Sequence, residues 1–147
     1  MRRHVLSCNV FIRKSDVIVA TSARTTHGFE IIAEPVFKVA NDAPEGAIGT
    51  AVLEALRAYQ VNVLPPSPDM STKPSTLLRI AGYRNWGQLD KGSLNVVVEG
   101  DSDWLTLIPT QREPEGGVSH LNALAVKCRL TAEAIELALR KAGALCC

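Results

Sequence analysis

Apolar and polar residues follow one another along the chain in patterns that predict strands first and a helix after them. Residues 4–13, HVLSCNVFIR, alternate between the two kinds, and residues 16–22, DVIVATS, are rich in valine and isoleucine, so both are predicted strands. Apolar residues continue to Val39, and Pro35 among them indicates an edge strand or a break, because proline has no N–H to donate within a sheet. After the helix-starting segment NDAPEG, residues 47–59 place apolar side chains at helical spacing and predict a helix.

The second half of the chain repeats this order. Residues 94–110 hold two apolar runs around a Gly-Asp-Ser-Asp segment, which predicts a hairpin. QREPEGG is a predicted turn, and two short extended segments and a helix over residues 131–143 follow it. Thr131 is the predicted N-cap of this helix, and Gly143 is predicted to end it.

A proline-rich segment separates the two halves. Residues 60–75, QVNVLPPSPDMSTKPS, contain four prolines and are predicted to form an extended connector. Two short helices are predicted after it, in STLLRIAGY, where Ser75 is a candidate cap, and in NWGQLDKG.

The halves, about residues 4–59 and 94–143, can be aligned with each other. An offset of 110 − 21 = 89 aligns the strands through Thr21 and Thr110, and an offset of 140 − 57 = 83 aligns the helices. The identities are few, so duplication and convergence on one strand–helix pattern both stay open. In either case the strands cluster instead of alternating with helices. This order predicts a single α+β domain over residues 1–147, with helices packed on a twisted, mostly antiparallel sheet.

Composition narrows the possible functions. The chain has 147 residues, of which 46% are hydrophobic and 21% charged, and its net charge is +1, so it lacks the strong basic excess of a nucleic-acid binder. The N-terminus has no apolar signal region, and no apolar run approaches the roughly 18 residues of a membrane span. Four cysteines without a CxxC pair indicate free thiols in a reducing cytosol. Cys8 and Cys128 are expected to pack as small apolar residues, and Cys146 and Cys147 to lie on a frayed tail.

The search for catalytic chemistry finds only weak candidates. The chain has no phosphate-binding loop and no nucleophile elbow, and its three histidines, His4, His27 and His120, lack the spacing of metal ligands, so we expect no metal site and no cofactor. Glu113 and Glu115 flank a proline after Arg112. A solvated turn is the favoured interpretation, a binding surface the second and catalysis the third.

The two tryptophans are notable because aromatic residues make up only 5% of the chain. Trp104 begins a predicted strand beside Asp103, and we expect it to be in the core or half-buried. For Trp86 we favour core packing, with an anchor for a protein partner as the alternative, because tryptophan is enriched at binding hot spots.

The segment from residue 85 to residue 143 resembles the immunity proteins of bacterial contact-dependent growth inhibition systems. It has a short helix with a tryptophan and a lysine, a strand hairpin, an I-x-P-T-x-R segment, a glycine-containing turn and a closing helix. The residues that carry the resemblance are Trp86, Lys91, Ile108, Pro109, Thr110, Arg112, Gly116, Gly117 and the segment from Ile135 to Leu139. The chain departs from the pattern at Val118, where family members often carry an aromatic residue after the turn glycine.

The resemblance implies a cytosolic binding protein and not an enzyme. Such a protein neutralises the C-terminal toxin domain of a large surface filament protein, often a nuclease, by covering its active site or substrate groove. It uses no cofactor and does not itself bind nucleic acid or membrane. Because acidic side chains would complement the cationic groove of a nuclease, we expect the partner-binding residues to be Asp101, Asp103, Arg112, Glu113, Glu115 and Trp86.

Two other functions stay open from the residues alone. One is a small enzyme with a cleft near Arg112, Glu113 and His120. The other is an adaptor domain that associates with itself through its sheet edges.

Overall fold

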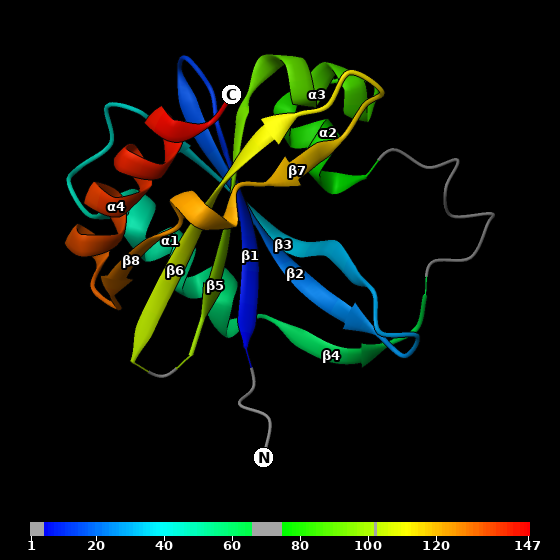
Figure 1. Ribbon diagram of the computed structural model, residues 1–147, viewed down its shortest axis with the longest axis horizontal. Helices are drawn as coiled ribbons and strands as arrows, with labels where there is room; N and C mark the ends of the chain where they lie inside the picture. The colour runs from blue at the N-terminus through cyan, green and yellow to red at the C-terminus, as the bar shows by residue number, and fades with distance from the viewer. Residues whose placement is uncertain (1–4, 66–74, 102) are drawn as a thin grey trace.

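The computed structural model describes residues 5–65, 75–101 and 103–147, and it confirms the predicted α+β fold (Figure 1). Its sheet has the order β3-β2-β1-β5-β6-β7, with β4 beside β2 and β8 beside β6. Neighbouring strands are antiparallel except for β2 and β4. The elements are β1 (Leu6–Ile12), β2 (Asp16–Thr25), β3 (Glu30–Ala40), α1 (Ala47–Arg57), β4 (Gln60–Val63), α2 (Thr76–Ala81), α3 (Trp86–Gly92), β5 (Leu94–Gly100), β6 (Trp104–Arg112), β7 (Val118–His120), the 3₁₀ turn η2 (Asn122–Leu124), β8 (Val126–Arg129) and α4 (Ala132–Leu145).

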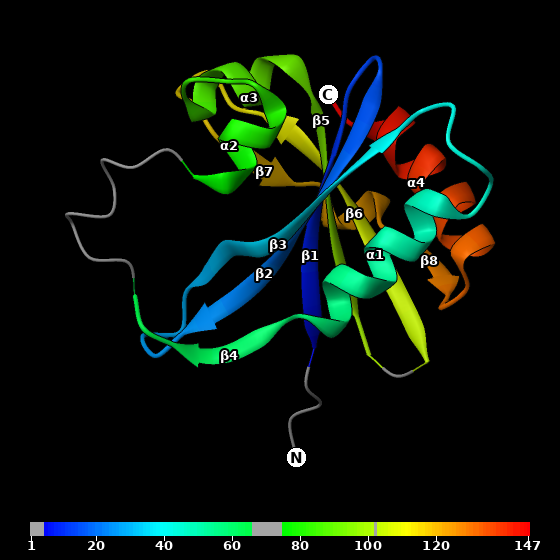
Figure 2. The same ribbon diagram turned by 180° about the vertical axis from the view of Figure 1, so that it is seen from behind.

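One face of the sheet is mostly apolar and is covered by α1 and α4. Figure 1 shows α1 behind the sheet, and Figure 2, from the other side, shows it in front. The strands alternate, so every second side chain points to these helices. The core that results contains Cys8, Val10, Val17, Val19, Val52, Leu56, Val96, Val98, Leu105, Leu107, Cys128, Ile135 and Leu139. Both strand cysteines are buried as expected, and burial raises the pKa of the Cys8 thiol to about 12.

The opposite face is only partly covered. The short helices α2 and α3 pack on it, with Leu77, Leu78 and Leu89 against Phe11, Ile18 and Ala20. Next to this second cluster a polar row crosses three strands, because the Asn9 side chain donates to Ser22 at 3.2 Å and accepts from Asn95 at 3.3 Å. The remaining part of this face, toward the β5–β6 hairpin, is therefore available to solvent or to a partner.

The starts of α2 and α4 follow the predicted capping chemistry. Ser75 accepts a hydrogen bond from the Leu78 N–H, and Thr131 accepts one from the Ala134 N–H. The predicted helix end at Gly143 is wrong, since α4 continues to Leu145. Gly143 is buried where the helix approaches the sheet, and a Cβ there would lie 2.8 Å from Cδ1 of Ile12. Glycine at this position therefore permits close packing instead of ending the helix.

The two halves are arranged symmetrically about the central β1–β5 pair. Core positions of the first half match those of the second at an offset of 88, as in 96 − 8 for Cys8 and Val96, and 107 − 19 for Val19 and Leu107. The predicted offset of 89 is wrong by one residue. This offset aligns Thr21 with Thr110. Thr21 faces α1 and donates to the Ala55 carbonyl at 2.5 Å, whereas Thr110 lies on the opposite face of the sheet. A slip of one residue exchanges the two faces of a strand.

Two segments expected to be irregular are parts of the sheet. The first four residues of the predicted connector form β4, and residues 66–74 lie outside the described ranges, as does His4. The C-terminal tail is not frayed: the Cys147 N–H donates to the Thr110 carbonyl, and the Arg112 N–H donates to the Cys147 carbonyl, each at 3.1 Å. The prediction that Pro35 marks an edge strand is confirmed, because β3 lies at one end of the sheet.

Candidate functional site

The side chain of Trp104 lies on the open part of the sheet. Its exposed fraction is 44%, so it is half-buried, the second of the two positions expected for it, and not part of the core. Trp104 faces Arg129 across the β6–β8 pair, and the Arg129 guanidinium carbon lies 3.9 Å from the centroid of the indole ring. This cation–π contact holds a large apolar ring in place at the surface.

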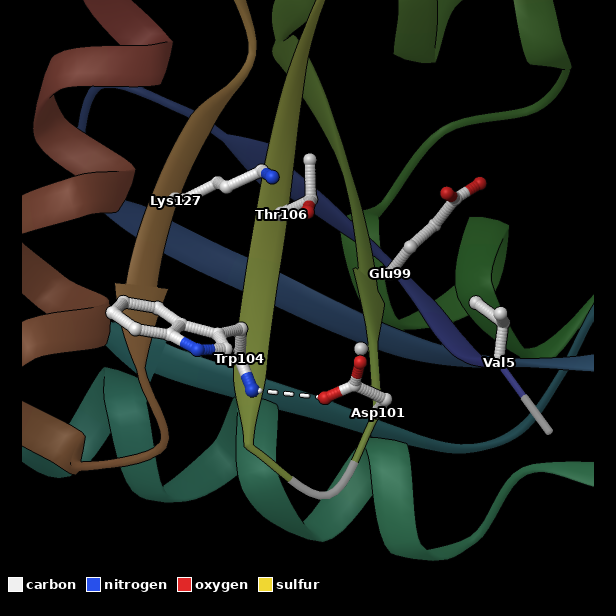
Figure 3. A pocket seen from close by; sticks show the side chains of 7 residues that line it. Val5, Glu99, Asp101, Trp104, Thr106 and Lys127 are labelled. Carbon is white, nitrogen blue, oxygen red and sulfur yellow. Dashed lines mark hydrogen bonds between the residues drawn. The ribbon is translucent and has the colours of Figure 1, made fainter. Parts of the chain in front are cut away.

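A hollow of about 450 Å³ adjoins this ring, between β5, β6 and β8 (Figure 3). Glu99 pairs with Thr106, and Thr106 pairs with Lys127, so the three side chains share one face of the sheet. Figure 3 shows Lys127 reaching across β6 toward Thr106, with Glu99 and Val5 on the other side of the hollow. We define the Trp104 surface as Glu99, Asp103, Trp104, Thr106, Lys127 and Arg129. It combines an aromatic ring with charges of both signs.

The two hairpin acids have different positions. One carboxylate oxygen of Asp101 accepts the N–H of Asp103 at 2.8 Å and that of Trp104 at 3.0 Å, so this side chain organises the turn. Asp103 is exposed in the turn directly before Trp104, and for this reason it is included in the Trp104 surface. Of the two hairpin acids, Asp101 therefore has a structural role in the turn, whether or not it contacts a partner.

The other predicted acids lie at the far end of the same strand. Arg112 is eight residues beyond Trp104 on β6, which is a distance of about 26 Å at the rise of a strand. Glu113 accepts a hydrogen bond from the Ser119 hydroxyl at 2.6 Å, and Arg112 donates to the Lys91 carbonyl at 3.3 Å. Glu115 is exposed on the same turn. The acids of the turn and those of the hairpin, all predicted to contact a partner, therefore lie at opposite ends of β6.

Trp86 occupies a third location. It is the first residue of α3, and its exposed fraction of 46% contradicts the favoured prediction of core packing. It lines a separate hollow of about 490 Å³ beside β3, with Glu30, Glu34 and Leu77 among the other lining residues. Trp86 and Trp104 are thus equally exposed but belong to different surfaces.

The residues of the alternative enzyme site are Arg112, Glu113 and His120. His120 on β7 pairs with Thr110 on β6 and is exposed. Among the described residues, no hydrogen bond or ion pair links it to Arg112 or Glu113. A search of the same residues finds no group of three or more His, Cys, Asp or Glu side chains that could hold a metal ion.

The strongest electrostatic contact lies under α2, away from these surfaces. The Arg13 guanidinium donates to both carboxylate oxygens of Asp16, at 2.6 and 2.7 Å, and to the Ala81 carbonyl at 2.6 Å. Hydrogen bonding to Arg13 lowers the pKa of the Asp16 carboxyl below its ordinary value, despite burial, and Lys38 at 3.7 Å adds to the effect. The pair fixes the β1–β2 turn against α2, which is a structural role.

Comparison with known proteins gives similarity of fold without similarity of sequence. No protein-family model and no curated protein matches the sequence. A solved protein of unknown function from Neisseria meningitidis superposes with a TM-score of 0.76 at 17% identity, covering 100% of this chain and 98% of that one. A chain from the CdiA-CT/CdiI toxin and immunity complex of Yersinia pseudotuberculosis superposes with a TM-score of 0.73 at 16% identity, covering 98% of each chain. At these identities the comparison establishes a shared fold.

None of the helices in the described ranges is both long and apolar enough to cross a bilayer.

Proposed function

We propose that this chain is an immunity protein that binds and neutralises the toxin domain of a contact-dependent growth inhibition system. The observation that carries the proposal is its likeness, over 98% of both chains, to a chain taken from a toxin and immunity complex. The resemblance of residues 85–143 to immunity proteins points the same way from sequence. In this proposal the chain acts in the cytoplasm, by binding and without catalysing a reaction, and the toxin domain is a nuclease.

We assign toxin contact to the Trp104 surface. Tryptophan and arginine are the residues most enriched at energetic hot spots, and here they are stacked on each other. Because Arg129 already holds the Trp104 ring in place, binding through this ring would cost little additional side-chain entropy. Glu99 on β5, Asp103 in the hairpin turn, and Lys127 and Arg129 on β8 supply charges that select a complementary partner and disfavour others.

The size of a typical interface separates this surface from the turn at the other end of β6. A standard complex buries about 800 Å² on each partner, which is a round patch with a radius of about 16 Å. Such a patch centred on Trp104 would include the β5–β6 hairpin and the ends of β5, β6 and β8. It would stop short of Glu113 and Glu115, which follow Arg112 at about 26 Å. We therefore assign these two acids no contact.

Co-expression tests the proposal directly. The toxin domain to use is the C-terminal region encoded by the reading frame upstream of this chain. We expect bacteria that produce this domain to grow only when the chain is co-produced, and the two proteins to purify together as a complex. Growth arrest despite full production of the folded chain, with no complex, would show that the proposal is wrong.

A further inference from the structure

A third cavity lies on the helix-covered side of the sheet, separate from the Trp104 surface. It has a volume of about 440 Å³ and lies among α4, the beginning of α1 and the strand ends near Ile12. This volume is within the range of small-molecule sites. Its walls are mostly apolar, with Ile12, Val17, Ile48, Leu94, Leu139 and Ala144.

One wall of this cavity carries a buried carboxylate. The exposed fraction of Glu136 is only 8%, and one of its oxygens accepts a hydrogen bond from the Ile48 N–H at 3.0 Å. This contact caps α1, whose N-cap residue Gly46 makes no side-chain hydrogen bond. The capping bond uses one oxygen and leaves acceptor capacity on the carboxylate.

Glu136 and Arg140 both line the cavity. Across the described ranges, no ion pair includes Glu136. Arg140 lies one helical turn further on, and its side chain is exposed. A buried carboxylate attracts the cationic group of a ligand more strongly than an exposed one does, because the effective dielectric constant is lower there. An ammonium group also donates hydrogen bonds to the carboxylate, which few water molecules can reach.

We propose that this cavity binds a small primary amine, with an apolar body of about six carbons against Ile48 and Leu139 and its ammonium group on Glu136. Shape and apolar lining accommodate the hydrocarbon, and the free acceptor capacity of the carboxylate selects the head group. The site is independent of the proposed toxin interface, since it lies on the other face of the sheet.

Titration of the full chain with n-hexylamine, observed through the methyl signals of isoleucine and leucine by NMR, tests this site. Hexylamine should shift the signals of Ile12, Ile48, Leu94 and Leu139 in a saturable way. 1-Hexanol, which has the same hydrocarbon but no charge, should bind at least about tenfold more weakly, and hexanoate more weakly still. Equal binding of amine and alcohol, or no shift of these signals, would overturn the proposal.

Two variants locate the interaction. In Glu136→Gln the amide oxygen still accepts the Ile48 N–H, so the fold is kept while the charge is removed. We expect its affinity for hexylamine to fall to that for hexanol, with hexanol binding unchanged. Ala144→Leu should fill the cavity from an exposed position and weaken both probes. A Glu136→Gln variant that still prefers the amine would contradict the assignment of the head group.

Discussion

The two faces of strands β5 and β6 are under different constraints: one packs against helices, and the other faces an open hollow. Leu105 and Leu107 have no exposed surface and lie against the helices. Trp104 and Thr106, which alternate with them along β6, face the open hollow. The same backbone positions both sets. The apolar face is constrained by packing, in which almost any loss of volume is felt. The open face around the hollow contributes little to packing, which leaves Trp104 there accessible for the binding role that we propose.

The covered part of the second face shows that polarity alone does not mark a binding surface. Asp16 and Trp104 both lie on the side away from α1 and α4, but Asp16 is buried under α2 and paired with Arg13. A buried, paired charge under α2 stabilises the fold. Charged or aromatic side chains that α2 does not cover can contact a partner. Substitutions on the two faces should therefore separate loss of stability from loss of binding.

The largest loss of stability is expected on the helix-covered face. Leu107→Ala removes a fully buried side chain and should lower the free energy of unfolding by about 4 kcal/mol. Thr106→Ala, its neighbour on the open face, should lower it by less than about 1 kcal/mol. Urea denaturation of both variants measures this contrast. Equal losses would mean that the two faces do not differ as described.

Breaking the buried ion pair should come next in size. Asp16→Asn leaves Arg13 without its charge partner and should cost about 3 kcal/mol near pH 7, whereas exposed Asp42→Asn should cost less than about 0.5 kcal/mol. Because the folded-state pKa of Asp16 is lowered below its ordinary value of 3.8, its contribution is present above that pH and is lost as pH falls through the folded pKa.

The difference in stability between wild type and Asp16→Asn should therefore narrow as the pH falls below about 4. Denaturant titrations at a series of pH values from 7 to the acid limit of folding follow this narrowing. A difference that stays constant over the whole range would show that the carboxylate charge is not what stabilises the turn.

The hairpin acids should show an intermediate contrast. Asp101→Ala removes the acceptor of two backbone N–H groups and should cost about 1–2 kcal/mol, while Asp103→Ala should cost less than about 0.5 kcal/mol. Thermal unfolding of the two variants distinguishes them. Asp103, if it contacts the toxin, should instead show its effect in the association rate and in the dependence of that rate on salt.

The smallest stability effect is expected at the cation–π contact. Arg129→Ala should lower the free energy of unfolding by only about 0.5–1 kcal/mol, because the contact is at the surface. The Trp104 ring would lose its support, so indole fluorescence should report a more mobile side chain. Arg140→Ala, an exposed arginine on α4, is the control and should leave the fluorescence unchanged.

Periodicity and capping residues predicted most of the fold. The strand patterns, the α4 cap at Thr131 and the edge position of Pro35 depend on local sequence, and all are confirmed. β4 was missed because its pairing with β2 depends on contacts distant in sequence, and the neighbouring prolines suggested a connector. The one-residue error in the repeat offset came from matching two threonines that lie on opposite faces of the sheet.

The candidate site was harder to predict. Two acid pairs were grouped by charge, although the second strand of the predicted hairpin lies between them in sequence and implied their separation. The hairpin register could have placed Glu99 beside Thr106. Lys127 and Arg129 could not have been placed, because the β6–β8 register is not visible in local patterns. The exposure of Trp86 was missed since residue type sets an average burial and not the position of a given side chain.

The two tryptophans provide the most direct test of the central claim, that the chain neutralises a toxin through the Trp104 surface. Calorimetric titration of the upstream-encoded toxin domain with Trp104→Ala and with Trp86→Ala compares two equally exposed rings on different surfaces. We predict an affinity loss of at least about 30-fold for Trp104→Ala and of less than about threefold for Trp86→Ala. Unchanged affinity in Trp104→Ala, or a larger loss in Trp86→Ala, would contradict it.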